Sequence, residues 1–265
     1  MNPDNLTDQG PMLRRRFSAE QLESYLAAGQ KSIRGWLHLT DSHLIAGIGQ
    51  FQTTSGFDGS LGEIGVLHGK SFILLYLLSH ASESTFAIDV FEQQELNLDR
   101  SGHGTSKEKF LSNLRECIGD DRHVRVFDCS SVAVSPEDLL DAVGPVRFFS
   151  IDGGHTDELT ANDLTLADRC LCEHGVILVD DYFNRNWPGV SNGVHRFFET
   201  RAPRLAPFAI GANKVFFCRP DFAEEYRAGL RRNIRPTYAE IFKRSVFFGF
   251  PVDIYRPPVD PPAAP

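Results

Sequence analysis

The chain contains 265 residues, of which 42% are hydrophobic, and it carries a formal net charge of −8. This length and composition suit one large domain with additions rather than two independent domains. The charge argues against nucleic-acid binding, because the one basic run, Arg14-Arg15-Arg16, is best interpreted as a solvated face. The sequence has neither an apolar leader nor a run of about 18 apolar residues, so we expect a soluble cytoplasmic protein that does not bind membranes.

The cysteines indicate a reducing compartment. They are scattered through the predicted helices and strands, without a C-x-x-C pair, at positions 117, 129, 170, 172 and 218. This spacing predicts neither a zinc site nor a disulfide framework. We interpret the cysteines as small buried apolar residues.

Residues 1–60 are predicted to form an N-terminal helical extension. Residues 1–16 are polar and contain prolines, so we expect them to be flexible. A helix is predicted from Ser18 to Gly29, because the side chains of Ser18 and Gln21 can each cap the other's backbone amide.

A second helix is predicted at residues 44–51. Gly47 and Gly49 lower the helix propensity of this segment. We expect the helix to cover the sheet edge or the mouth of a binding site.

Residues 61–218 are predicted to form the main α/β domain, because short apolar runs alternate with helix-length segments. Strands are predicted at 61–66, 85–88, 124–127, 146–151 and 176–179. Helices are predicted between them, at 71–80, 107–118, 136–142 and 157–172. Strands that are almost wholly apolar and spaced by helices are typical of a parallel sheet covered on both faces.

The end of this region predicts a change in sheet direction. After a helix at 192–200, strands at 205–210 and 214–218 are separated only by a short turn, Gly211-Ala212-Asn213. So short a connection joins antiparallel neighbours. The prediction is therefore a Rossmann-like, mostly parallel sheet of seven strands, with an antiparallel last strand and helices on both faces.

Residues 219–265 are predicted to contain a helix, at 221–233, and an extended Pro-rich end, at 256–265. Prolines lack the amide donor that helices and central strands need, so the Pro-rich end is expected to be solvated or to form an arm on a partner subunit. The sequence is compatible with a monomer and with a homo-oligomer. Aromatic residues gather just before the end, and we interpret them as core or subunit packing: Phe242, Phe247, Phe248, Phe250 and Tyr255.

Carboxylates and a histidine follow two neighbouring strands of the predicted sheet. Asp152 and His155 come after the strand at 146–151, and Asp180 and Asp181 come after the strand at 176–179. The carboxyl ends of adjacent parallel strands lie about 5 Å apart, and open sheets bind their ligands at that edge. These side chains are therefore expected to share one site.

The first predicted strand runs into a glycine-containing turn, Glu63-Ile64-Gly65-Val66-Leu67-His68-Gly69-Lys70-Ser71. Gly65 and Gly69 can let the backbone approach a ligand, or they can serve only close helix–strand packing. The dinucleotide fingerprint G-x-G-x-x-G is absent.

Polar residues also follow the second and third predicted strands. Asp89, with Glu92 as a second candidate, can accept hydrogen bonds from ribose hydroxyls, or it can cap the next helix. The segment Asp128-Cys129-Ser130-Ser131 stands where an adenine ring could be recognised, and an ordinary turn is the alternative.

Together these motifs resemble those of the S-adenosylmethionine-dependent class I methyltransferases. The resemblance is to family 24, the subgroup related to macrocin- and mycinamicin-type sugar O-methyltransferases, and it covers residues 60–218. Its residues are the glycine-containing turn from Glu63 to Ser71, Ile88-Asp89, Ile151-Asp152-Gly153-Gly154-His155, Val179-Asp180-Asp181-Tyr182 and Trp187-Pro188-Gly189-Val190. The turn departs from the commoner D-x-G-x-G-x-G pattern, so detailed cofactor contacts cannot be copied.

The resemblance implies a set of site residues. S-adenosyl-L-methionine would be held by Glu63, Gly65, Gly69, Ser71, Asp89, Asp128, Ser130 and Ser131. Asp152, Asp180 and Asp181 would hold a divalent metal, with Mg²⁺ expected because hard cations prefer carboxylate oxygens. The alternative for these acids is helix capping and loop hydrogen bonding.

His155 is the first candidate for the general base, acting with Asp152, because an imidazole can accept a proton near neutral pH. A structural hydrogen-bonding role is the alternative. His195 is predicted to face either the site or the adjoining Phe197 and Phe198. The polar loop at 91–104 could close over substrate or be a disordered surface loop.

The sequence therefore predicts an S-adenosylmethionine-dependent, metal-assisted O-methyltransferase that acts on a hydroxyl of a sugar, glycoside or other small metabolite. One alternative is a nicotinamide-dependent oxidoreductase, although the predicted terminal hairpin is not expected for it. The other is a non-catalytic subunit that binds a nucleotide and holds a partner by its C-terminal aromatic residues.

Overall fold

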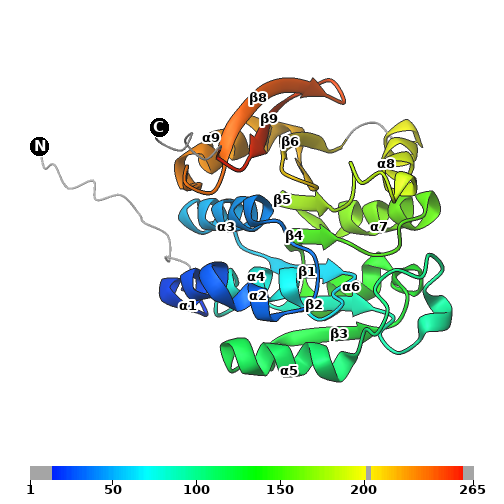
Figure 1. Ribbon diagram of the computed structural model, residues 1–265. Helices are drawn as coiled ribbons and strands as arrows, with labels where there is room; N and C mark the ends of the chain where they lie inside the picture. The colour runs from blue at the N-terminus through cyan, green and yellow to red at the C-terminus, as the bar shows by residue number, and fades with distance from the viewer. Residues whose placement is uncertain (1–13, 201–203, 259–265) are drawn as a thin grey trace, which may run out of the picture.

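The computed structural model describes residues 14–200 and 204–258. Its strands are β1 (Ser60–Ile64), β2 (Thr85–Asp89), β3 (Val124–Asp128), β4 (Val146–Ile151), β5 (Leu171–Val179), β6 (Ala206–Ile210), β7 (Val215–Cys218), β8 (Glu240–Phe247) and β9 (Phe250–Arg256). They form one sheet in the order β3-β2-β1-β4-β5-β7-β6-β9-β8 (Figure 1). The mostly parallel, helix-covered α/β sheet is confirmed.

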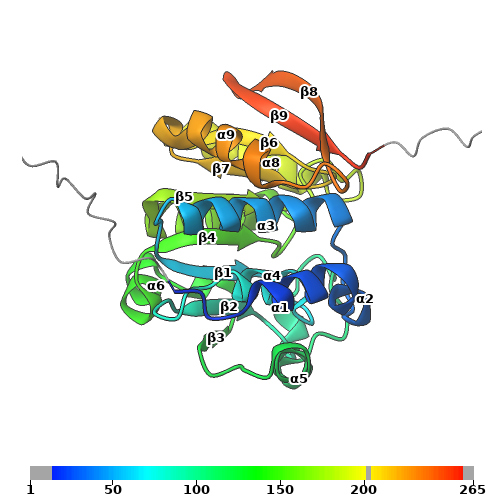
Figure 2. The same cartoon turned by 90° about the vertical axis from the view of Figure 1, so that its left-hand side faces the viewer.

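Helices cover both faces of this sheet. They are α1 (Ala19–Ser24), α2 (Gln30–Ser32), α3 (Leu39–Thr54), α4 (Lys70–Leu77), α5 (Lys107–Ile118), α6 (Pro136–Val143), α7 (Asp157–Cys170), α8 (Pro188–Thr200) and α9 (Ala223–Asn233). A π-helical turn, Tyr25–Gly29, joins α1 to α2. Helices α1, α3, α4, α5 and α9 contribute to the core on one face, and α6, α7 and α8 contribute to the core on the other (Figures 1 and 2).

The predicted hairpin at the end of the main domain is confirmed. Strand β7 pairs antiparallel with both β5 and β6, so it lies between them in the sheet. The predicted count of seven strands is too low, because a second hairpin, β8–β9, extends the sheet beyond β6. Strand β8 is mostly exposed and Lys243 and Arg244 interrupt its apolar residues, which hid this edge strand from a pattern search for apolar runs.

Two element boundaries also differ from the prediction. Helix α7 ends at Cys170, and β5 already begins at Leu171, so the strand is longer than the apolar run 176–179 on which the prediction rested. Helix α3 is longer than the predicted 44–51. A Cβ atom on Gly49 would lie 2.6 Å from Leu78 Cδ1, so this glycine permits close helix packing rather than ending the helix.

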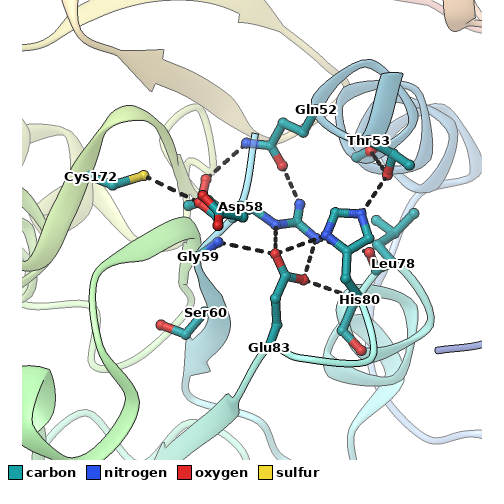
Figure 3. A network of polar contacts seen from close by, with 12 residues as sticks. Gln52, Thr53, Asp58, Gly59, Ser60, Leu78, His80, Glu83 and Cys172 are labelled. Carbon is teal, nitrogen blue, oxygen red and sulfur yellow. Dashed lines mark hydrogen bonds and ion pairs between the residues drawn. The ribbon is translucent and has the colours of Figure 1, made fainter. Parts of the chain in front are cut away.

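The amino-terminal edge of the sheet contains a buried polar network around Arg147 of β4 (Figure 3). Its guanidinium donates to Glu83 Oε1 at 2.7 Å and Oε2 at 2.9 Å, and to Gln52 Oε1 at 2.6 Å. His80 donates its backbone amide to Glu83. The hydrogen bonds from His80 and Arg147 outweigh burial and hold the pKa of Glu83 at about 2. Charged groups fully removed from water thus join β4, α3 and the segment before β2.

The predicted flexible segment at the start of the chain lies mostly outside the described residues, as does most of the Pro-rich end. Within the described ranges, no helix combines the length and the apolar character needed to cross a membrane. The proposed domain boundaries after residues 60 and 218 stay predictions.

Candidate active site

The carboxyl edge of the parallel strands brings the predicted site residues together. Ile64 of β1 pairs with Ile151 of β4, and Ile151 pairs with Val179 of β5. The edge continues one residue further, since Asp152 N donates to Ile64 O at 2.9 Å and Asp180 N donates to Ile151 O at 2.9 Å. The acids that follow β4 and β5 therefore lie side by side, as the sequence predicted.

Gly65 forms a bend that only a residue without a side chain can fill. Its φ is +83°, and a Cβ atom there would lie 1.8 Å from the carbonyl oxygen of Asp152. Gly69, with φ +90°, is the N-cap of α4, so free amides of that helix face the same turn. A Cβ atom on Gly69 would lie 2.9 Å from the Phe110 ring, so both glycines permit close packing of the chain at the end of β1.

Glu63 is fully buried beside this turn. Ser150 Oγ donates to Glu63 Oε1 at 2.8 Å, while Oε2 has no hydrogen-bond partner in the described part of the chain. Burial raises the pKa of Glu63 to about 7. An unsatisfied buried carboxylate oxygen next to the glycine bend fits a cationic or amine ligand group.

A small cavity of about 110 Å³ begins at Gly65 and passes the end of β2. Asp89 lines it and accepts hydrogen bonds from Leu67 N at 3.0 Å and Phe91 N at 2.8 Å. Burial raises the pKa of Asp89. Ser130 and Ser131 line the far end of the same cavity.

Five predicted positions line neither this cavity nor the larger one beside it: Glu63, Gly69, Glu92, Asp128 and His195. Asp128 is exposed and bonds to Gln93 and Lys107. Glu92 accepts from the backbone amide of Lys107, at the start of α5. His195 lies 3.2 Å from Tyr182 OH, and its ring contacts Phe248, so it faces the aromatic layer.

A larger cavity of about 570 Å³ shares Gly65 and Asp152 with the small one. Its floor carries a cluster made of Asp152, His155 and Asp181, whose ligand atoms all lie within 4.8 Å of one another. Burial and the nearby Asp180 raise the pKa of Asp152 well above its usual value. Two carboxylates and an imidazole at this spacing fit a divalent cation.

His155 is held between two carboxylates. Its Nδ1 lies 2.7 Å from Asp99 Oδ2, its Nε2 lies 3.1 Å from Asp181 Oδ2, and its ring stacks on Trp187 at 4.4 Å between centroids. Burial lowers the pKa of the imidazole, but the hydrogen bonds to Asp181 and Asp99 outweigh burial and raise it to about 9. The ring is thus fixed in position and protonated at neutral pH.

Asp180, predicted as a metal ligand, has a different partner in this structure. Lys214 Nζ lies 2.5 Å from Asp180 Oδ2, and both side chains are buried. Asn213 donates to Asp180 Oδ1 at 3.3 Å and also to Asp181. A fixed ammonium group therefore already neutralises Asp180, whereas Asp181 faces His155.

The turn that carries Asn213 and Lys214 is held from α3. Asp41 is fully buried and accepts from Ala212 N at 2.9 Å and Asn213 N at 3.3 Å. Burial raises the pKa of Asp41 to about 6, against the lowering effect of Lys214. The N-terminal extension thus positions part of the acidic cluster.

Asp41, Asp99, Asn213 and Lys214 were not identified from the sequence. Lys214 carried a usable signal, because a lysine directly before the apolar strand Val215–Cys218 is unusual unless it is paired. The other three come from a turn, a helix and a loop that meet only in the folded chain.

Comparison with known families identifies a domain at this site. Residues 63–182 match the model of the methyltransferase domain of family 24. No curated protein sequence matches the chain at a significant level.

Solved structures share the fold at low sequence identity. The O-methyltransferase NovP has a TM-score of 0.56 and 19% identity, over 68% of this chain and 80% of that one. A putative O-methyltransferase from Klebsiella pneumoniae has a TM-score of 0.50 and 15% identity, over 76% and 90%. The methyltransferase MycE, in complex with Mg, SAH and mycinamycin VI, has a TM-score of 0.50 and 13% identity, over 77% and 55%.

Proposed function

Because residues 63–182 form a methyltransferase domain of family 24, we propose that the protein transfers the methyl group of S-adenosylmethionine to a hydroxyl oxygen of a small molecule. The acceptor class is a sugar, a glycoside or another small metabolite. The observation that carries the proposal is the junction of the two cavities at Gly65 and Asp152, by which the small cavity lined by Asp89, Ser130 and Ser131 adjoins the larger acidic one.

The small cavity and its surroundings suit the methyl donor. Gly65 lines both cavities, Ser71 lines the larger one and Gly69 is the N-cap of α4 between them, so the methionine end of the donor would lie here. Glu63 Oε2, which has no hydrogen-bond partner within the described residues, would accept from its amino group. Asp89 stands where ribose hydroxyls would bind. Ser130 and Ser131 would face the adenine side.

Methyl transfer is an in-line displacement. The acceptor oxygen forms a bond to the methyl carbon as the carbon–sulfur bond breaks, and the sulfonium becomes a neutral thioether. The enzyme must therefore align the two groups, exclude water and take up the hydroxyl proton. In this proposal His155 first releases its own proton to water, and the neutral imidazole then takes up the hydroxyl proton while Asp99 and Asp181 hold the ring in place.

Asp152 and Asp181, with His155 beside them, would hold a divalent cation such as Mg²⁺, whose chemistry when bound is to lower the pKa of an acceptor hydroxyl. Asp180 would support the site through Lys214 and Asn213. The antiparallel β7 and the family match do not favour a nicotinamide-dependent oxidoreductase. Methylation of any acceptor would exclude a non-catalytic subunit.

Substitution of the acidic cluster tests the proposal. We expect Asp152→Asn and Asp181→Asn to lower methyl transfer at least about 100-fold, because each removes a ligand of the cation site and Asp181→Asn also removes a partner that holds the His155 ring. Transfer to a panel of glycosides is followed by mass spectrometry. Affinity for S-adenosylmethionine, measured by calorimetry, should change little. Asp141→Asn, at an exposed carboxylate of α6 outside the cavities, is the matched control. Unchanged transfer in both cluster variants would contradict the proposal.

A further inference from the structure

The lining of the large cavity includes two arginines from different segments. Arg34 lies between α2 and α3, and Arg100 lies in the loop after β2. Both side chains are exposed and line the same cavity. Within the described residues, neither guanidinium has a carboxylate at ion-pair distance, although the chain as a whole is acidic.

The segments that carry these arginines meet each other. A Cβ atom on Gly104 would lie 3.1 Å from Arg34 Nη1, so the Arg34 guanidinium rests on the backbone four residues beyond Arg100. The two positive groups therefore stand on one rim of the cavity rather than on separate surfaces.

Both segments are fixed by hydrogen bonds to the site. Next to Arg100, Asp99 accepts from His155 N at 2.6 Å and from Ser101 N at 2.8 Å. Next to Arg34, Lys70 Nζ donates to Gly35 O at 2.6 Å. The rim is thus anchored to the proposed proton acceptor on one side and to the start of α4 on the other.

The acidic side chains Asp180 and Asp181 of the cavity pair with groups other than Arg34 and Arg100. Lys214 Nζ lies 2.5 Å from Asp180 Oδ2 and His155 Nε2 lies 3.1 Å from Asp181 Oδ2, so both carboxylates already have a nitrogen partner. A cation bound between Asp152 and Asp181 would make the floor more positive still. An anionic group of the acceptor would therefore find two arginines at the rim that have no carboxylate partner within the described residues.

Trp36 completes this rim. Its side chain is 81% exposed although it lines the cavity, and its neighbour Gly35 is held by Lys70. A large ring left open on a fixed loop offers an apolar surface for a flat or ring-shaped ligand.

We infer that the acceptor carries an anionic group, a phosphate or a carboxylate, which binds between Arg34 and Arg100 while a ring of the acceptor lies against Trp36. Guanidinium groups bind both oxyanions through paired hydrogen bonds. This inference rests on the proposed function, because it describes the acceptor that would receive the methyl group.

Binding of small anionic sugars tests the inference. Glucose 1-phosphate and glucuronate are the anionic probes, and methyl glucoside is the neutral one. Calorimetry is run on the full chain saturated with S-adenosylhomocysteine, with EDTA present so that a metal cannot bridge the anion. We expect one or both anionic probes to bind at least about tenfold more tightly than the neutral probe, as paired charge-assisted hydrogen bonds require. The stronger of the two identifies the oxyanion.

The variants locate the binding site. The double variant Arg34→Gln/Arg100→Gln should bind the anionic probes at least about tenfold more weakly than the natural chain. Trp36→Ala should lower the affinity for all three sugars. Arg232→Gln, at an exposed arginine of α9 outside the cavity, is the matched control and should bind as the natural chain does.

Anion binding that is absent, or equal in the double variant and the natural chain, would overturn the inference. S-adenosylhomocysteine affinity is measured in every variant. If S-adenosylhomocysteine binds normally and the anions do not, only the inference about the arginine rim is contradicted. If the natural chain does not bind S-adenosylhomocysteine, the proposed function is contradicted.

Discussion

At the scale of single residues, the protonation of His155 links the stability of the fold to pH. Its pKa is raised from 6.5 to about 9 because Asp99 and Asp181 bind its two ring nitrogens. The folded chain therefore holds a proton that the unfolded chain releases above pH 6.5. The resulting stabilisation is fully present below pH 6.5 and disappears as the pH rises through about 9.

This linkage predicts a pH-dependent effect of His155→Gln in the absence of metal. The loss in free energy of unfolding should be about 3 kcal/mol larger at pH 6 than at pH 10. Urea unfolding in EDTA measures it. His123→Gln, at a half-exposed ring that faces Asp120 at 3.9 Å, is the control and should show a difference under about 1 kcal/mol. An effect of His155→Gln that does not vary with pH would show that the imidazole is not held between two charged carboxylates.

Elements of the sheet are joined by polar contacts as well as by apolar packing. Glu83, Gln52 and Arg147 link three elements at the amino-terminal edge (Figure 3). Glu83→Gln would leave a buried guanidinium without its counter-charge, and we expect a loss of about 3–5 kcal/mol in the free energy of unfolding. Glu137→Gln, in an exposed pair with Arg169, is the matched control, with an expected loss under about 1 kcal/mol. Denaturant titration measures both, and equal small losses would contradict the structural role of the network.

The elements also show what a single sequence can predict. The apolar runs at β4 and β5 and the helix-length segment between them were enough to predict that Asp152 and Asp180 are neighbours, because strand order follows from crossover geometry. The hairpin β8–β9 was missed, since its alternating exposed residues do not form an apolar run. Asp41, Asp99 and Lys214 were missed because their roles depend on contacts between segments far apart in the chain.

At the scale of the whole molecule, the two edges of the sheet hold two different groups of buried charged residues. The amino-terminal edge buries a closed network around Arg147, while the carboxyl edge opens into two cavities that meet at Gly65 and Asp152. The central claim is that a methyl donor in the small cavity faces the cluster Asp152, His155 and Asp181 in the large one.

NMR of the bound donor tests this claim most directly. S-adenosylmethionine labelled with ¹³C on its methyl group is bound to the full chain, and Mn²⁺ is added in place of Mg²⁺. The account predicts strong paramagnetic broadening of the methyl signal in the natural chain, and little broadening in Asp152→Asn or Asp181→Asn at the same donor occupancy. A methyl signal that stays sharp with Mn²⁺ bound, or that broadens equally in the cluster variants, would contradict it.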